Sequence, residues 1–231
     1  MRFETPLETG ILLRRYKRFL ADVKLRGGRT VTAHVPNTGS MLATALEGGR
    51  VALSRQRAPG RKLAWTWELA LIGRTWVGVN TWRTNHIASE AISSGRLGPL
   101  RGYPGLRREV PVGASSRIDF LLERASGRCW VEVKNVTMAA GRRALFPDAV
   151  TARGAKHLEE LMRLARRGER AVMLFIINRA DCTSMSPTGE IDPRYAELLE
   201  RASGRGVELI AYRTRASLRE IVIDRKIPVM L

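Results

Sequence analysis

The chain has 231 residues, of which 44% are apolar, so it is long enough for one large or two small domains with a buried core. Its net charge of +18 favours a polyanionic partner, and nucleic acid is the first polyanion to consider. Two cysteines, Cys129 and Cys182, are too few for a disulfide framework or a zinc site. Because no apolar run approaches ~20 residues and the N-terminus lacks a signal-peptide core, we expect a cytoplasmic protein without membrane contact.

Residues 1–78 are rich in β-strand patterns. Leu12–Leu25 is predicted as one long segment, which Gly27 and Gly28 turn into a returning strand at Thr30–Val35. Two more strands are expected at residues 50–54 and 65–72. Several short strands with glycine turns in fewer than 80 residues predict a small barrel of the OB type.

A basic cluster lies within this first domain. Tyr16 and Phe19 alternate with its cations, an arrangement that suits the backbone and bases of a nucleic acid. A strand face exposed to solvent explains the same basic cluster equally well. The predicted nucleic-acid-binding residues of this domain are Arg14, Arg15, Lys17, Arg18, Arg61 and Lys62.

The loop after residue 35 is a candidate anion site. It contains small polar residues and a glycine, which can present backbone N–H groups to an anion. A plain turn is the more frequent explanation of such a loop. The residues concerned are Asn37, Thr38, Gly39 and Ser40.

Residues 79–231 form the second predicted domain, which begins with a helix over Asn80–Ser94. Thr81 or Thr84 is its expected cap, and Gly95 ends it. A strand over residues 107–112 follows. Two carboxylates in this region are candidates for an additional acid in an active site: Glu90 and Glu109.

The central feature of the sequence is a β-hairpin over residues 115–136. Alternation places Asp119 on the face opposite Ile118 and Phe120. On the second strand Glu132 and Lys134 alternate with buried apolar residues. Two acids and one lysine are therefore expected to meet on one side of the paired strands.

This triad predicts a metal site, because two carboxylates suit a hard divalent cation such as Mg²⁺ or Mn²⁺. Asp119 and Glu132 are the predicted metal ligands, and Lys134 is placed to orient an attacking water or to stabilise charge on a phosphate. The order resembles the D…(E)xK signature of the PD-(D/E)xK nucleases, although Ile118 stands where a proline usually precedes the first acid. A surface salt bridge is the alternative.

The remaining elements complete the order of such a nuclease. A loop is expected over residues 137–150, a helix over 151–167, a buried strand over 171–177, a helix from Asp192 and a strand over 207–212. The order helix-β-β-β-helix-β is the core order of the PD-(D/E)xK fold. Three residues on the second helix are predicted to face substrate phosphate: Arg153, Lys156 and His157.

The chain also resembles the sugar fermentation stimulation protein A family along nearly its full length. The resemblance rests on six blocks, at residues 15–23, 34–41, 61–69, 116–122, 131–137 and 146–158. It implies a mixed α/β protein with an N-terminal OB-like barrel, a nuclease-like second domain, and DNA binding without sequence preference. Val35 departs from the family, in which we expect cysteine at this position.

Two functional hypotheses follow. The first is a Mg²⁺-dependent nuclease that holds DNA on the barrel and hydrolyses a phosphodiester at Asp119, Glu132 and Lys134. The second is a non-catalytic DNA-binding regulator of sugar (maltose) metabolism genes. A third possibility, a small anionic ligand that controls DNA affinity, stays open. RNA is not excluded as the partner, and the sequence leaves the oligomeric state open, a homodimer included.

Overall fold

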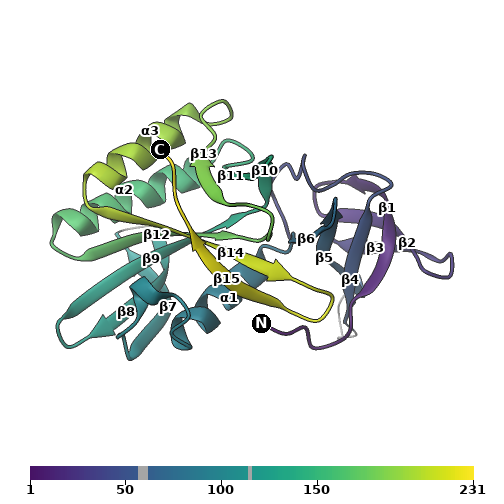
Figure 1. Cartoon of the computed structure of the whole chain (residues 1–231), viewed down its shortest axis with the longest axis horizontal. Helices are drawn as coiled ribbons and strands as arrows, with labels where there is room; N and C mark the ends of the chain where they lie inside the picture. Colours follow the sequence, from purple (N-terminus) through teal and green to yellow (C-terminus); the bar gives the residue numbers. More distant parts are fainter. Residues whose placement is uncertain (57–61, 114–115) are drawn as a thin grey trace.

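The computed structural model describes residues 1–56, 62–113 and 116–231. Two units lie side by side along the long axis of the molecule, a barrel and a larger α/β unit (Figure 1). Within the described residues, no helix is both long and apolar enough to cross a lipid bilayer.

The first unit is a closed five-stranded barrel with one added strand. Its strands are paired in the order β3-β2-β1-β4-β5-β6, and a parallel pairing of β3 with β5 closes the ring. Leu12, Val23 and Trp67, none of them exposed, fill the interior. The strands are β1 (Glu8–Tyr16), β2 (Leu20–Leu25), β3 (Thr30–His34), β4 (Arg50–Arg55), β5 (Trp65–Ile72) and β6 (Thr75–Gly78).

The prediction of one long segment over Leu12–Leu25 is wrong, because the chain reverses inside it. Tyr16 pairs with Leu20, and Lys17 and Arg18 both adopt positive φ angles, 47° and 61°. Consecutive residues with positive φ form a tight hairpin turn that is normally signalled by glycine or asparagine. Since two cations occupy these positions, the local sequence gave no sign of the turn.

The second unit is built on a six-stranded sheet in the order β15-β14-β12-β9-β8-β7. Helix α1 lies on one face, and α2 and α3 lie on the other (Figure 1). The predicted order helix-β-β-β-helix-β is confirmed. The elements of this sheet and its helices are α1 (Trp82–Ser93), η1 (Gly98–Leu100), β7 (Gly105–Val112), β8 (Ser116–Arg124), β9 (Gly127–Val136), α2 (Ala152–Arg166), β12 (Arg170–Ile177), α3 (Pro193–Gly204), β14 (Val207–Ala216) and β15 (Ile221–Ile227).

The loop expected over residues 137–150 is only partly a loop. It contains β10 (Met138–Ala140) and β11 (Arg143–Phe146), and β11 pairs in parallel with β13 (Ser184–Pro187), a strand that the sequence did not reveal. Strands of three or four residues carry too little alternation to be recognised locally. The pairing of β11 with β13 joins segments some 40 residues apart, so it appears only in the folded chain.

Polar contacts join the barrel to the α/β unit. The Thr81 hydroxyl, at the N-cap of α1, makes no capping bond but donates to the Pro36 carbonyl of the barrel at 2.7 Å. The Ser40 hydroxyl donates to the Asp148 carbonyl at 2.8 Å, and the Gly78 N–H donates to the Asn178 carbonyl at 2.8 Å. The 36–41 loop is thus held directly against the edge of the second unit.

Gly39 has no space for a side chain at this contact. An added Cβ would lie 2.6 Å from the Asp148 carboxylate, which itself accepts the Met41 N–H at 3.3 Å. We expect Gly39→Ala to displace that carboxylate and lower the free energy of unfolding by about 1–2 kcal/mol. Urea unfolding measures this loss. Gly204→Ala is the control, because a Cβ there meets nothing within 4 Å, and an equal effect of both changes would contradict the prediction.

Candidate active site

The regular alternation of side chains along strand β8 is interrupted at Asp119. Ile118 packs in the core beneath α2 and α3, whereas Phe120 packs in the core beneath α1. The expectation that Ile118 and Phe120 share one face is therefore wrong. The neighbouring strand breaks at the same level, since Glu109 has a φ of 52° between residues that pair with Phe120 and Ile118. Because the backbone is irregular here, strand alternation does not determine the direction of the Asp119 carboxylate.

Two donors from different elements hold the Asp119 carboxylate. Asn85 of α1 donates from its side-chain amide to Oδ1 at 2.8 Å, and the Val133 N–H of β9 donates to Oδ2 at 2.8 Å. Burial, and then repulsion by Glu132, raise the pKa of Asp119 from 3.8 to about 6, although both hydrogen bonds and Lys134 oppose the rise. Two carboxylates thus repel each other here.

Glu132 forms the centre of a buried charged cluster. It is 2% exposed, its Oε1 accepts from Lys134 Nζ at 2.6 Å, and the same oxygen contacts His157 Nδ1. Lys134 Nζ also lies 3.3 Å from His157 Nδ1. Burial alone would raise the pKa of Glu132, but Lys134 and His157 outweigh it, so the pKa lies below its usual value and the carboxylate is ionised.

The second oxygen of Glu132 is left without a partner. Oε2 is buried and makes no hydrogen bond within the described chain. The buried hydroxyl of Tyr195 also has no partner there, and burial and then the negative charge of Glu132 raise its pKa. An unpaired buried carboxylate oxygen is costly, and such atoms are uncommon in native structures. The cluster therefore has an open acceptor in its interior.

These groups fit a divalent cation. Over residues 1–56, 62–113 and 116–231, no group of three or more His, Cys, Asp or Glu side chains is arranged to hold a metal. Mg²⁺ does not need such a cage, because it is commonly bound by one or two carboxylates, water and substrate phosphate. A bound cation would give Oε2 of Glu132 a partner, and its positive charge would offset the repulsion between Glu132 and Asp119.

Neither additional acid joins this cluster. Glu90 is 54% exposed, and its Oε1 accepts from the N-terminal amino group of Met1 at 2.9 Å. Glu109 is exposed on β7. Their assignment as further acids of the site stays a prediction without a contact to support it.

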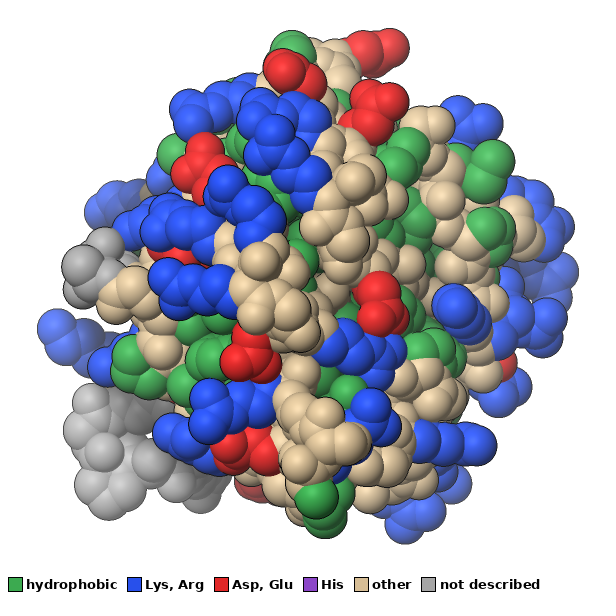
Figure 2. All heavy atoms as spheres, turned by 90° about the vertical axis from the view of Figure 1, so that its left-hand side faces the viewer, with side chains coloured by type: hydrophobic (Ala, Val, Ile, Leu, Met, Phe, Trp, Pro, Cys, Tyr) green, Lys and Arg blue, Asp and Glu red, His purple; other side chains and the backbone are tan. Residues whose placement is uncertain are grey.

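A basic cavity of about 760 Å³ adjoins the cluster at the start of α2. Its walls contain the three predicted phosphate-facing residues of that helix. His157, however, is only 4% exposed and contacts Glu132, whereas Arg153 is exposed and Lys156 is partly exposed. Two further residues line this cavity and were not predicted: Arg117, which is exposed on β8, and Ser116, whose buried hydroxyl has no partner among the described residues. Figure 2 shows that Lys and Arg side chains are widespread over this end of the molecule.

Comparison with known proteins gives the chain its family. The sequence profile of the sugar fermentation stimulation protein RE domain matches residues 82–220, and that of the SfsA N-terminal OB domain matches residues 13–79. The chain belongs to the sugar fermentation stimulation protein family. A homolog from Geobacter metallireducens is 52% identical over 100% of both chains, and one from Pelobacter propionicus is 53% identical over 98% of each.

A solved structure shares the whole architecture. The structure of Pyrococcus furiosus SfsA in complex with Ca²⁺ is 29% identical, covers 100% of this chain and 98% of its own, and has a TM-score of 0.91. The predicted family and the predicted combination of an OB-type barrel with an α/β domain are therefore confirmed for this member of the sugar fermentation stimulation protein family.

The barrel cations of this family member serve different purposes. Arg15 points inward and donates to the carbonyls of Asn37, Gly39 and Ser40, so it supports the 36–41 loop. Arg14 pairs with Asp22 at 2.8 Å. Of the other predicted barrel cations, Lys17, Arg18 and Lys62 are exposed and have no ion pair in the described residues, while Arg61 lies outside the described residues.

Two N–H groups in and directly after the loop over Asn37–Ser40 donate to side chains of the protein itself. Met41 N–H donates to the Asp148 carboxylate, while Gly39 N–H donates to the side chain of Asn37. Asn37 is 5% exposed and also donates to the Val79 carbonyl at 3.1 Å. The binding of an external anion by this loop stays a prediction.

Proposed function

We propose that this protein is a Mg²⁺-dependent phosphodiesterase that cleaves nucleic acid, principally DNA, without sequence preference. The observation that carries the proposal is the buried Glu132–Lys134–His157 cluster, which has an unpaired carboxylate oxygen and lies beside the mutually repelled Asp119. The Ca²⁺ in the related Pyrococcus furiosus structure supports divalent-metal binding. We also infer that residues 1–78 and 79–231 are the two functional domains.

The chain supplies the positioning for this reaction. Asp119 and Glu132 would hold Mg²⁺ or Mn²⁺, and the bound ion would supply Lewis-acid activation of a phosphoryl oxygen. Lys134, whose Nζ is fixed by Glu132 at 2.6 Å, is placed to stabilise negative charge developing on the phosphate or to orient a water. His157 supports both partners from α2. The basic cavity beside α2 offers Arg117 and Arg153 to the neighbouring phosphates.

The deciding experiment is cleavage of labelled single- and double-stranded DNA and RNA in Mg²⁺ or Mn²⁺. We expect cleavage by the wild type and none by Asp119→Ala prepared identically. EDTA should stop the reaction. Absence of cleavage by both proteins, together with tight binding, would overturn the nuclease proposal.

The second candidate is a non-catalytic DNA-binding regulator of sugar metabolism. The observations that favour it are the net charge of +18 and the name of the family, which refers to sugar fermentation. A regulator needs no acidic pair against a phosphate backbone, so the retained Asp119 and Glu132 weigh against it. Cleavage dependent on Asp119 would exclude a purely non-catalytic role.

Salt dependence tests whether the basic surface binds DNA at all. Each phosphate neutralised on duplex DNA should contribute about −0.9 to the slope of log K against log salt concentration. For six to ten contacts we expect affinity to fall roughly 10³–10⁵-fold between 50 and 200 mM salt. Fluorescence anisotropy with Ca²⁺ in place of Mg²⁺ measures it. A flat profile would contradict DNA binding by this surface.

A further inference from the structure

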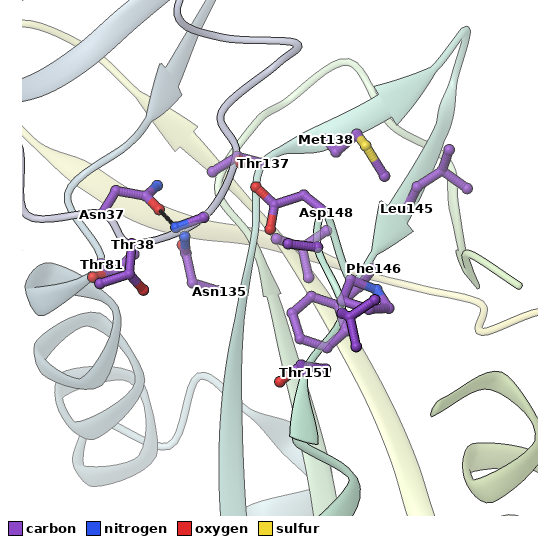
Figure 3. Close-up of a pocket in the computed structure, with 15 residues that line it drawn as sticks. Asn37, Thr38, Thr81, Asn135, Thr137, Met138, Leu145, Phe146, Asp148 and Thr151 are labelled. Atoms are coloured by element: carbon purple, nitrogen blue, oxygen red, sulfur yellow. Dashed lines mark hydrogen bonds between the residues drawn. The ribbon is translucent and has the colours of Figure 1, made fainter. Parts of the chain in front are cut away.

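A second cavity, of about 260 Å³, lies between the barrel and the α/β unit (Figure 3). The 36–41 loop and Thr81 form one wall, and the segments after β9 and β11 form the other. Asn135, at the end of β9, lines the cavity and directly follows Lys134. Thr151 lines this cavity and Ala152 lines the basic one, so both cavities reach the start of α2, and this one also reaches the end of the strand that carries Glu132 and Lys134.

The lining of this cavity differs from that of the basic one. None of its fifteen described lining residues is a lysine or an arginine, and one, Asp148, is an acid. A phosphate would be repelled by that carboxylate. Apolar walls come from Phe146, Pro147 and Val150, and the side chain of Val150 is 77% exposed at the rim. The site suits a flat, uncharged group with a polar edge.

The wall formed by β9 and the segment after β11 has two polar groups with unused hydrogen-bonding capacity, Asn135 and Asp148. Asn135 Oδ1 already accepts from Thr84 at 3.0 Å and from Asn178 at 2.5 Å, which leaves its Nδ2 as a donor without a partner in the described chain. Asp148 Oδ2 accepts from Met41 and Ser40, which leaves Oδ1 as an acceptor. A fixed donor and a fixed acceptor at one cavity match the hydrogen-bonding edge of a nucleobase.

An exposed aromatic ring lies where the barrel meets the start of α1, outside the residues that line this cavity. Trp82 follows the cavity residue Thr81, is 63% exposed, and has its ring 5.1 Å from the ring of His34 on the barrel. Exposed aromatic rings beside a basic barrel are typical of surfaces that stack unpaired bases.

We propose that this interdomain cavity takes one unpaired nucleobase of the strand whose backbone lies at Asp119, Glu132 and Lys134, so that the protein prefers single-stranded nucleic acid. The inference rests on the proposed function in that both sites act on the same strand. A base within a duplex is stacked and paired and must lose both interactions before it can enter a cavity, whereas a base of a single strand is already unpaired. The preference for single strands follows from that difference.

The test compares binding of a 20-nucleotide single strand and of its 20-base-pair duplex, both fluorescein-labelled, in Ca²⁺, with gels to confirm that the oligonucleotides stay intact. The wild type should bind the single strand at least tenfold more tightly. Thr38→Tyr, whose larger side chain should fill the cavity from its wall and leave no room for a base, should reduce the single-strand affinity about tenfold and leave the duplex affinity within twofold. Val150→Ser should act in the same direction, because it removes the apolar rim.

Leu42→Tyr is the matched control, since Leu42 is 75% exposed on the same side of the barrel but outside this cavity, and it should change neither affinity. A 2-aminopurine base in the single strand should change its fluorescence on binding to the wild type and less on binding to Thr38→Tyr. Equal wild-type affinities for the two oligonucleotides, or an unchanged ratio in both cavity variants, would overturn the inference.

These binding results separate the two proposals. If the cavity variants change the ratio of single-strand to duplex affinity but the wild type does not cleave, the base-binding proposal is supported and the nuclease proposal is rejected. Cleavage without a shifted ratio would support the nuclease and reject the cavity.

Discussion

Lys134→Met should slow metal-dependent cleavage by about 10²–10³-fold, the usual loss when one group that stabilises transition-state charge is removed. Methionine keeps most of the aliphatic length of the lysine but cannot donate to Glu132 or to a phosphate oxygen. Because Lys134 is only 12% exposed, it contributes little to the basic surface, and DNA affinity in Ca²⁺ should change less than threefold. Single-turnover cleavage and anisotropy on the same preparation measure the two effects.

Lys24→Met is the control for this experiment, because it removes the same charge from an exposed strand position on the barrel. Its cleavage rate should stay within about twofold of wild type. Equal loss of binding and cleavage in Lys134→Met would assign Lys134 to binding and contradict a role in the chemical step. In Lys134→Met the buried Glu132 keeps only His157 as a partner, and thermal unfolding of both variants shows whether this variant still folds.

The second large effect is on stability in the absence of metal. Below pH 3.8 the carboxyl of Asp119 is protonated in the folded and unfolded states, so its raised pKa has no effect. Between 3.8 and about 6 the folded protein retains a proton that the unfolded chain has released, and the free energy of unfolding falls as pH rises. Above pH 6 the raised pKa of Asp119 lowers the free energy of unfolding by a constant amount of about 3 kcal/mol, relative to a carboxyl with an unshifted pKa.

Asp119→Asn should remove this loss. In EDTA at pH 7.5 we expect the variant to be more stable than wild type by about 2–3 kcal/mol, and at pH 4 the two should be nearly equal. Asp224→Asn provides a control of opposite sign, since hydrogen bonding to Arg213 lowers the pKa of Asp224 and its loss should destabilise the protein at pH 7.5. Ca²⁺ should stabilise the wild type but not Asp119→Asn. Lower stability of Asp119→Asn in EDTA would contradict the repulsion between the two carboxylates.

Local patterns accounted for the larger elements. The apolar run of β12 and the periodicity and caps of α2 and α3 are properties of contiguous residues, so the sequence predicted them. The turn at Lys17 and Arg18 was missed because it lacks the usual turn residues. The strands β10, β11 and β13 were missed because they have only three or four residues, and β11 and β13 pair across some 40 residues of chain.

The candidate site shows the same division. The spacing in E-x-K placed Glu132 and Lys134 together, since strand residues two apart share a face, and the short hairpin brought Asp119 near them. Nothing local indicated that the alternation inverts at Asp119, that Asn85 holds its carboxylate, or that His157 contacts Glu132 rather than solvent. These contacts join four elements of the chain, α1, β8, β9 and α2.

The sequence by itself thus determined the family, the two-part architecture and the residue types of the site, because strand alternation, helix periodicity and charge are written into neighbouring positions. Only the tertiary structure decided which oxygen of Glu132 is left unpaired, which cations are exposed, and where the 36–41 loop meets Asp148 to enclose a cavity. Those features arise from packing between segments up to about 100 residues apart, and no local pattern encodes such packing.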